Sequence, residues 1–410
     1  MRIMVQKFGG TSVATKERML LVLEKIRTGL STGCKMLAVL SARAGETNSL
    51  LALASEWSDT PDPAECDVLL STGEQVSVAL FAMLLKDAGI KARSCTGGQI
   101  GIVSNDVFGK ARVKQVDTQT IETLFRDHDV LVVTGFQGVT EDGRITTLGR
   151  GGSDTSAVAL AAAVKAELCE IYTDVEGVFT TDPNICAKAR KLEQITYNEM
   201  LEMASMGAKV LEIRSVEFAK KFNVPLLVRS TFSDAPGTLI TQEDQIMEQI
   251  VVSSIAYDKD QARITLHSVR DKPGVAASIF SPLAEANLQV DMIVQTPSRD
   301  GVTDMSFTVS RKDLKHALEI MEKVGKNADG IEVLYDDNVA KVSAIGVGMR
   351  NHSGVAAKLF AAFQKENINI IMISTSEIKI SCIIEAKYTE LAVRTLHDTF
   401  KLDKGSYLED

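Results

Sequence analysis

The sequence predicts an α/β protein whose first half is a mostly parallel sheet sandwiched by helices, followed by two copies of a smaller α+β module. Two observations support this fold class. Short apolar strand patterns alternate with helical patterns through the first half, and two segments of the second half repeat at one spacing. In addition, polar and glycine-rich clusters follow several expected strands. Since ligands bind at the carboxyl ends of strands in such sheets, these clusters are the candidate functional sites.

The first expected unit is a strand over residues 3–8, a turn at Gly9 and Gly10, and a helix over residues 16–28. A second buried strand covers residues 36–40. A helix comes next, with residues 71–74 near its start. The remaining strands are expected over residues 92–96, 130–134, 168–173 and 225–229, and further helices over residues 155–165 and 209–221.

Composition limits the function classes. The chain has 410 residues and a net charge of −9, with 45% hydrophobic residues, which suits two or three globular domains. Both charge signs are interspersed, so we expect no nucleic acid partner. The six cysteines show no C-x-x-C spacing and the five histidines no ligand spacing, so neither a zinc site nor a disulfide framework is expected. No signal peptide pattern is present and no apolar run approaches transmembrane length. We therefore expect a cytoplasmic protein with no membrane partner.

The stretch over residues 147–157 is a glycine-rich loop that enters a helix. Glycines at 149, 151 and 152 allow positive φ and let backbone N–H groups approach an anion. Either Ser153 or Asp154 is expected to cap the helix. The free N–H groups and the dipole of its first turn favour an anionic ligand there.

Two other polar clusters follow expected strands. Lys7 lies beside Gly9 and Gly10, where an ammonium and free N–H groups suit a polyphosphate. Its spacing is not the Walker pattern, because the lysine precedes the glycines, and no dinucleotide fingerprint is complete in the chain. The other cluster covers residues 172–184, a turn-rich segment that is long for a connection without a binding role.

Six motifs in order resemble those of the aspartate kinases, of the amino acid kinase superfamily. The motifs are residues 7–12 (KFGGTS), 71–74 (STGE), 135–138 (GFQG), 147–154 (TLGRGGSD), 172–174 (YTD) and 207–210 (GAKV). The resemblance covers essentially the whole chain, and it implies an amino acid kinase domain over residues 1–245.

The resemblance implies transfer of the γ-phosphoryl of MgATP to the β-carboxylate of L-aspartate, the first step of lysine, threonine and methionine biosynthesis. Such transfer depends on alignment and on compensation of charge. The implied cofactors are ATP and Mg²⁺, with the metal carried by ATP and no metal ligand assigned to the protein. The implied catalytic residues are Lys7, Glu74 and Asp154. Asp154 would organise either Lys7 or the metal, unless it only caps the helix.

The resemblance also implies two sets of binding residues. The aspartate set is Thr47, Glu74, Arg150, Gly151, Gly152, Ser153 and Asp154, in which Arg150 suits a carboxylate and Glu74 the ammonium. The ATP set is Lys7, Phe8, Gly9, Gly10, Ser41, Thr173, Asp174, Phe179, Thr180, Thr181, Asp182, Pro183, Asn184, Lys209 and Val210.

Three positions depart from the family pattern. Many relatives have tyrosine at Phe179, arginine at Asn184 and methionine at Arg43. Loss of a guanidinium at 184 should weaken the contact with ATP unless Lys188, Arg190 or Lys191 replaces it. The sequence offers no physical account of Arg43.

The second half repeats itself. Residues 271–276 align with 351–356, and residues 287–295 with 367–375, both at a spacing of 80. Each copy has a β-α-β-β-α-β pattern, with helices over residues 275–286 and 355–366. One interpretation is a duplicated structural or dimerisation module. The resemblance implies instead two ferredoxin-like ACT domains, over residues 262–337 and 340–410, that bind lysine, threonine or both as feedback inhibitors.

The effector contacts follow from the same resemblance. One set is Asp271, Gly274, Ala276 and Gln295 with Asn369 and Ile370. A second set is Ser376 and Glu377, which otherwise form a solvated strand edge. Partners implied are L-aspartate and a second copy of the chain through the ACT domains, with a separately translated regulatory subunit starting near Met247 left open. The rival functions are a catalytically silent amino acid sensor and an amino acid kinase of different substrate.

Overall fold

The computed structural model describes residues 1–207, 210–243, 251–297, 300–327 and 331–404. The chain forms two compact units. The first consists of Met1–Val178 and Lys191–Glu248, and the second of Phe179–Arg190 and Gln249–Asp410. The second unit therefore includes a segment that interrupts the first unit in sequence.

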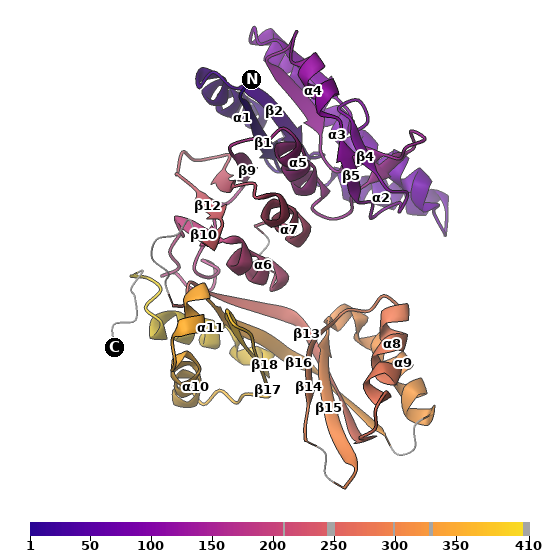
Figure 1. Ribbon diagram of the computed structural model, residues 1–410, viewed down its shortest axis with the longest axis vertical. Helices are drawn as coiled ribbons and strands as arrows, with labels where there is room; N and C mark the ends of the chain where they lie inside the picture. The colour runs from indigo at the N-terminus through magenta and orange to yellow at the C-terminus, as the bar shows by residue number, and fades with distance from the viewer. Residues whose placement is uncertain (208–209, 244–250, 298–299, 328–330, 405–410) are drawn as a thin grey trace. The chain divides into compact units, whose positions relative to one another are not determined.

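The first unit is built on an eight-stranded sheet of order β10-β12-β11-β9-β1-β2-β6-β3 (Figure 1). All neighbouring strands pair in parallel except β11 and β12. This confirms the mostly parallel sheet. Its strands are β1 (Ile3–Phe8), β2 (Lys35–Leu40), β3 (Ala92–Cys95), β6 (Val130–Thr134), β9 (Cys169–Thr173), β10 (Gln194–Thr196), β11 (Leu226–Ser230) and β12 (Thr238–Thr241).

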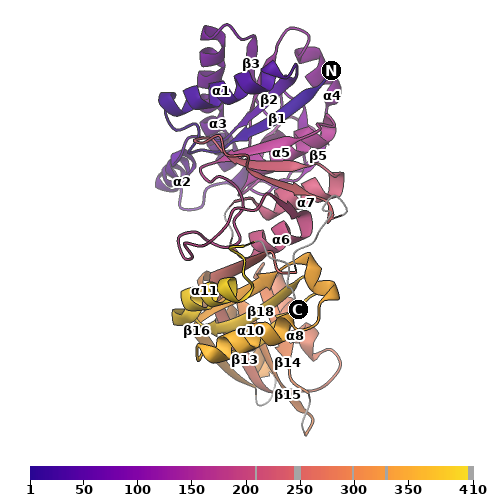
Figure 2. The same ribbon diagram turned by 90° about the vertical axis from the view of Figure 1, so that its left-hand side faces the viewer.

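Helices cover the two faces of the sheet (Figures 1 and 2). On one face, α1 (Lys16–Ser31) and the second half of α3 (Pro63–Asp87) pack against Phe8, Met36 and their neighbours in one core cluster. α5 (Gly152–Ala163) packs against β1, β2 and β9. Because side chains alternate along a strand, Phe8 enters the core cluster and Lys7 points to the other face. The other helices of this unit are α2 (Glu46–Trp57), α4 (Thr118–Leu124), α6 (Tyr197–Ser205) and α7 (Ile213–Phe222).

A smaller four-stranded sheet completes the first unit, in the order β5-β4-β7-β8. Its strands are β4 (Ile102–Ser104), β5 (Val113–Val116), β7 (Gln137–Val139) and β8 (Ile145–Thr147). The N-terminal half of α3 contacts β8, and β8 leads directly into the loop before α5.

α3 differs from the sequence prediction in two ways. The helix starts at Pro63, capped by Asp62, so residues 71–74 lie in its middle and not near its start. By length and composition it could also cross a membrane, contrary to the expectation that no apolar run was long enough. However, 44% of its most apolar window is buried inside the protein. Its buried residues include the polar side chains Asp67, Ser71 and Glu74. This helix therefore packs as a core helix of the first unit.

The second unit contains one six-stranded antiparallel sheet of order β14-β15-β13-β16-β18-β17. Its strands are β13 (Ser254–Arg270), β14 (Val290–Gln295), β15 (Val302–Val309), β16 (Glu332–Ile345), β17 (Met372–Thr375) and β18 (Lys379–Glu385). Its helices are α8 (Val275–Glu285), α9 (Leu314–Asn327), α10 (Val355–Lys365) and α11 (Thr389–Thr399), with short 3₁₀ turns at Arg311–Asp313, Val347–Asn351 and Ala386–Tyr388.

The two repeats share this sheet. α8 and α10 start at Val275 and Val355, at the spacing of 80 residues that the sequence predicted. The long strands β13 and β16 pair along most of their length. The start of β13 therefore lies beside the part of β16 that pairs with β18, in the second repeat. The sheet also curves enough for its end strands β14 and β17 to contact each other.

Candidate active site

The buried ion pair between Lys7 and Asp154 lies at the carboxyl ends of the central strands. The Lys7 Nζ is 2.6 Å from the Asp154 Oδ1, and both side chains are 11% exposed. Lys7 comes from β1, and Asp154 from the first turn of α5. The two residues are 147 positions apart in sequence, and the parallel sheet brings them together. Among the roles left open for Asp154, the structure thus shows a direct contact with Lys7.

The loop before α5 corrects one prediction. Gly151, and neither Ser153 nor Asp154, is the N-cap residue, with φ of 64° and no side-chain cap hydrogen bond. Ser153 and Asp154 belong to the first helical turn, where both are buried. A Cβ at 151 would overlap the Glu212 side chain, so both the left-handed φ and the close approach require glycine there.

Glu74 presents a buried carboxylate to the end of β2. Its Oε1 accepts a hydrogen bond of 3.1 Å from the N–H of Ala42, while its Oε2 is buried without a partner. Burial raises the pKa of Glu74 to about 7, although the Ala42 N–H acts in the opposite direction. An unpartnered buried carboxylate oxygen is costly, so this atom can still accept a hydrogen bond.

The glycine turn after β1 sits close to the loop after β2. The Gly9 N–H donates to the Tyr172 carbonyl at 3.2 Å, and the Ala44 N–H donates to the Gly10 carbonyl at 3.1 Å. A Cβ on Gly10 would lie 2.7 Å from the Ala42 carbonyl oxygen. The turn thus packs backbone against backbone, and it brings the loop with Ser41 beside β1.

Glu212 lies near Asp154 and Arg150, and Thr47 follows the loop after β2. Arg150 is exposed and Thr47 is half-buried in the first turn of α2. Glu212 precedes α7, and its pKa is raised by burial and by the nearby Asp154 carboxylate. The structure therefore brings an exposed guanidinium and an additional carboxylate to the predicted aspartate loop.

The predicted nucleotide residues divide between the units. Thr173 ends β9 and Asp174 follows it, exposed, in the first unit. Phe179 to Asn184 belong to the second unit, where the Ile255 N–H donates to the Thr180 carbonyl at 2.8 Å. Val210 is half-buried, and Lys209 lies outside the described residues.

Two side chains hold this segment in the second unit. The Thr180 Oγ1 lies 3.0 Å from the buried His397 Nε2, and the Tyr257 hydroxyl donates to Asp182 at 2.8 Å. Lys188 pairs with Asp398 at 2.8 Å. This lysine, one of three cations considered as substitutes for an arginine at position 184, is therefore already engaged in an ion pair.

Two of the three departures from the family pattern have local partners. The Arg43 guanidinium pairs with Glu46 at 3.0 Å, one turn along the chain. The Asn184 backbone and side-chain N–H groups both donate to the Asp182 Oδ1, at 2.8 and 3.0 Å, and so form a tight turn. Arg43 thereby gains a partner at the start of α2, and Asn184 stabilises its own turn.

Comparison with known proteins identifies the family. The model for the amino acid kinase family matches residues 2–230, and two models for the ACT domain match residues 263–326 and 342–400. An aspartate kinase of Stutzerimonas stutzeri is 54% identical over 404 residues, which cover 98% of each chain. The chain belongs to the aspartate kinase family. As a member, it is an ATP-dependent kinase with tandem ACT domains.

Solved structures agree with the fold of the kinase. E. coli aspartokinase III in complex with aspartate and ADP has a TM-score of 0.79 and 29% identity, with 97% of this chain and 99% of that chain covered. The same enzyme in complex with lysine and aspartate has a TM-score of 0.76 and 28% identity, at the same coverage.

The predicted effector residues lie at strand ends, in turns and at the start of α8 (Val275–Glu285) in the kinase's second unit, and all but Ile370 are exposed. Asp271 follows β13, and Gly274 caps α8 with φ of 93°. Gln295 ends β14, whereas Asn369 and Ile370 precede β17. Because β14 and β17 contact each other, the strands next to the two halves of this set are neighbours. Ser376 and Glu377 form the exposed turn after β17, and Glu377 pairs with Arg350 at 3.2 Å.

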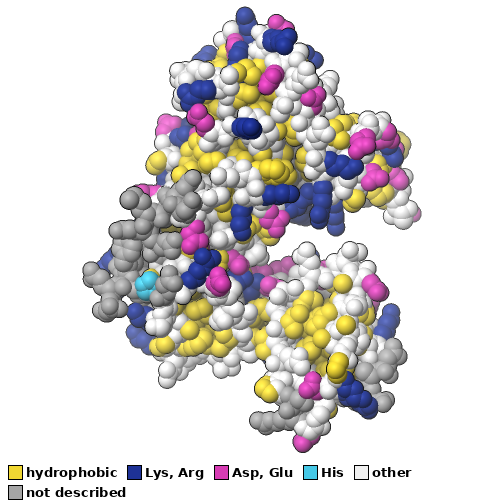
Figure 3. Space-filling model, viewed as in Figure 1, with side chains coloured by type: hydrophobic (Ala, Val, Ile, Leu, Met, Phe, Trp, Pro, Cys, Tyr) yellow, Lys and Arg dark blue, Asp and Glu magenta, His cyan; other side chains and the backbone are white. Residues whose placement is uncertain are grey.

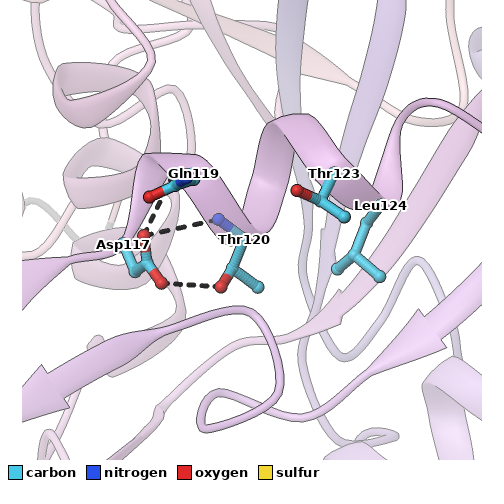
Figure 4. Close-up of a pocket in the computed structure, with 5 residues that line it drawn as sticks. All are labelled: Asp117, Gln119, Thr120, Thr123 and Leu124. Carbon is cyan, nitrogen blue, oxygen red and sulfur yellow. Dashed lines mark hydrogen bonds between the residues drawn. The ribbon is translucent and has the colours of Figure 1, made fainter.

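A shallow pocket in the kinase lies along α4 and contains none of the predicted residues (Figure 4). The Asp117 carboxylate accepts from the N–H groups of Gln119 and Thr120 and from the Thr120 hydroxyl, at 3.0, 3.3 and 2.6 Å. These bonds cap the helix, so the only acid in the lining of this pocket already has a structural role.

Sequence reasoning missed three polar residues of the kinase near the loop before α5. Glu212 is described above. Arg214 donates to the carbonyls of Leu148 and Ala111, with the second bond at 3.0 Å. Asp67 is completely buried in α3. A carboxylate within an apolar helical run is the signal that could have identified Asp67.

Proposed function

We propose that this chain is a feedback-regulated aspartate kinase that transfers the γ-phosphoryl of ATP to the β-carboxylate of L-aspartate, to give 4-phospho-L-aspartate and ADP. The observation that supports it best is the pairing of Lys7 with Asp154 at the carboxyl end of the parallel sheet. It places a buried ammonium beside the glycine turn and the loop of Arg150, where both anionic substrates would meet.

Lys7 is the proposed electrostatic catalyst. Its ammonium is held by Asp154 within the protein, so it needs no reorganisation when phosphate arrives. A preorganised cation is most effective where water is excluded, and both side chains here are largely buried. Asp154 then acts by orienting the Lys7 ammonium. The glycine turn is proposed to contact the same phosphates, with the Gly9 N–H already donating to the Tyr172 carbonyl.

Arg150 and Glu74 are the proposed recognition residues for the amino acid. The exposed guanidinium suits a carboxylate of the substrate, with Thr47 and residues 151–153 completing the contact. The free Oε2 of Glu74 suits the α-ammonium. We propose that the nucleotide is bound by Phe8, Ser41, Thr173, Asp174, the segment 179–184, Lys209 and Val210.

Mg²⁺ fits this site as a partner of the ATP phosphates. Within the described residues, no group of three or more His, Cys, Asp or Glu side chains is placed to hold a metal ion. Asp154 is the nearest acid to Lys7 and is engaged with it. When bound with ATP, the ion would neutralise phosphate charge. The chain's own contribution would remain the orientation of Lys7.

The ACT domains are proposed to bind lysine, threonine or both as inhibitors, at the sets around Asp271 and around Glu377. E. coli aspartokinase III has been solved with lysine and aspartate, which supports an amino acid effector. The pathway role follows from that regulation: the enzyme would catalyse the first step towards lysine, threonine and methionine.

Assembly and location complete the proposal. Ile293, Tyr335 and Ile373 in strands of the second unit are 52%, 58% and 42% exposed, which supports a homo-oligomer formed through the ACT domains. A regulatory subunit that starts near Met247 remains part of the proposal, although this residue lies outside the described ranges. We place the enzyme in the cytoplasm, consistent with six free cysteines.

One assay tests the proposal against its rivals. ADP release is measured with purified full-length protein and MgATP, with L-aspartate or L-glutamate as acceptor. We expect release that depends on L-aspartate. Release only with L-glutamate would indicate a different amino acid kinase, and no acceptor-dependent release would favour an amino acid sensor without catalysis.

A further inference from the structure

Asp67 is completely buried and lies next to the loop that carries the predicted aspartate residues. Its Oδ2 accepts from the N–H groups of Thr147 and Gly109, at 2.8 and 2.9 Å. Its Oδ1 accepts from the Thr147 hydroxyl at 2.6 Å and from the Gly109 N–H at 3.1 Å. Two backbone segments and one hydroxyl thus converge on a single carboxylate.

The acceptor of these bonds is on α3, and the donors are on β8 and on a separate loop. Thr147 is the last residue of β8, immediately before the loop over residues 148–151. Gly109 belongs to the segment that packs on this loop: the Ala111 N–H donates to the Thr147 carbonyl at 2.9 Å. A Cβ on Gly149 would lie 3.2 Å from the Gly109 carbonyl oxygen. Asp67 therefore fixes both the start of the loop and the backbone beneath it.

The same helix carries Glu74. Asp67, Ser71 and Glu74 follow the i, i+4, i+7 spacing, so they share one face of α3, and all three are buried. The Ser71 carbonyl accepts from the Gln137 side chain at 2.7 Å, which ties the same face to β7. Asp67 and Glu74 are about 10 Å apart along the helix axis, at the usual rise per residue. The rigid helix α3 thus fixes the distance between the Glu74 carboxylate and the start of the loop that carries Arg150.

Burial of a carboxylate with no cation is unfavourable unless it is fully hydrogen-bonded. Among the ion pairs of the described residues, none includes Asp67. Four hydrogen bonds from backbone and hydroxyl compensate, and charge-assisted bonds of this kind are stronger and more directional than neutral ones. Such an anchor defines the path of the loop more sharply than apolar packing would.

We propose that Asp67 is a positioning residue for binding of the amino acid acceptor: it sets the distance between Glu74 and the loop of Arg150, and it acts without touching substrate. This inference rests on the proposed function, because it assumes that Glu74 and Arg150 hold the two ends of one amino acid. Loss of the anchor would let the loop shift relative to Glu74. Recognition of the acceptor would then suffer more than recognition of ATP.

Asp67→Asn tests this inference. Asparagine keeps the shape but replaces one acceptor oxygen by an NH₂ group, which cannot accept from the N–H groups of Thr147 and Gly109. We expect the KM for L-aspartate to rise about tenfold or more, with the KM for ATP changed by less than about twofold, since loss of a charge-assisted bond at a buried site is large. Equilibrium binding of L-aspartate, measured by calorimetry, should weaken in parallel.

Asp117→Asn is the matched control. Asp117 also accepts from two backbone N–H groups and one threonine hydroxyl, but it caps α4. The Asp117→Asn variant should not selectively change either the KM for L-aspartate or the KM for ATP. An equal rise of both KM values in Asp67→Asn, or the same selective rise in Asp117→Asn, would assign Asp67 to general stability.

A second pair of variants covers the case in which Asp67→Asn does not fold. Thr147→Val removes the hydroxyl that donates to Asp67, and Thr147→Ser retains it. Thr147→Val should raise the KM for L-aspartate selectively. Thr147→Ser should keep the wild-type KM. Unchanged kinetics in Thr147→Val would overturn the inference. If instead the wild type shows no L-aspartate-dependent ADP release, the proposed function fails, and the failure is then distinguishable from that of Asp67.

Discussion

The ammonium of Lys7 and the carboxylate of Asp154 are 2.6 Å apart and both largely buried, although they come from the first strand and the fifth helix of the first unit. Their contact joins the glycine turn after β1 to the loop before α5. Any ligand that binds across these two loops must meet the Lys7 ammonium. The pair is therefore the natural first target for mutagenesis.

Lys7→Ala should lower kcat by roughly 10² to 10³, the effect typical of losing one preorganised electrostatic donor. The measurement is steady-state ADP release at saturating MgATP and L-aspartate. Lys25→Ala is a control, because Lys25 also pairs with an acid, Asp234, at 2.6 Å, but on helix α1. A kcat near that of the wild type would remove Lys7 from the mechanism.

Glu74 predicts a pH dependence of acceptor binding. Its pKa is about 7 in the folded protein, so it is largely protonated at pH 6 and ionised at pH 8. Because the substrate ammonium requires the ionised form, the KM for L-aspartate should fall about tenfold from pH 6 to pH 8, the change in ionised fraction for such a group. Glu74→Gln should raise this KM and flatten its pH profile. A profile unchanged in Glu74→Gln would contradict the assignment.

The carboxyl of Glu74 should also make the stability of the fold fall as the pH rises. Its folded pKa lies above the ordinary value of about 4.5, so the contribution of the protonated carboxyl to stability is fully present below about pH 4.5 and is lost as the pH rises through about 7. Glu74→Gln should thus gain stability relative to the wild type between pH 5 and pH 8, measured as the shift of the thermal unfolding midpoint. A constant difference between the two proteins across this window would argue against the raised pKa.

His397 predicts acid sensitivity of the second unit. Burial lowers its pKa, with Asp398 and Asp403 opposing the shift and Lys188 and Arg190 adding to it. A lowered pKa stabilises the fold above the ordinary value of 6.5, and the contribution is lost as the pH falls through the folded pKa. Chemical unfolding monitored between pH 7 and pH 5 should show a smaller acid-induced loss in His397→Gln. His352→Gln, in the same unit, is the control and should follow the wild type.

The effector set predicts a selective loss of inhibition. Asp271→Ala should raise the lysine or threonine concentration for half inhibition about tenfold, the size of a typical allosteric coupling. Glu285→Ala, an exposed acid at the end of α8, should keep the wild-type value. If Asp271→Ala is inhibited normally and Glu377→Gln is not, the effector site lies at the turn after β17.

Local patterns were sufficient to predict most elements of the fold. The strands β1, β2, β6 and β9 and the 80-residue repeat follow the sequence closely, because burial of a parallel strand leaves a continuous apolar run. The antiparallel β12 and the shared pairing of β13 with β16 depend on contacts between distant segments. Periodicity contains no information on such pairings.

In the candidate site too, local features could be predicted from the sequence and contacts between distant segments could not. Lys7 and Asp154 could be placed together because Lys7 lies near the end of one strand of the parallel sheet, and Asp154 lies in the first turn of the helix that leads to its neighbouring strand. The cap was predicted wrongly, since Ser153 and Asp154 are usual N-cap residues and the close approach of Glu212 to Gly151 is a tertiary contact. Asp67 was missed because its partners Gly109 and Thr147 are far from it in sequence.

The segment Phe179–Arg190 lies inside the catalytic half of the sequence yet folds with the ACT domains. Anyone who wishes to exchange regulatory modules between relatives must therefore treat it as part of the donor module. A hybrid joined at residue 247 would keep Thr180 and Asp182 from one parent and receive the positions of His397 and Tyr257 from the other. Transplanting both segments together preserves those matched partners, so the natural recombination unit of this chain is discontinuous.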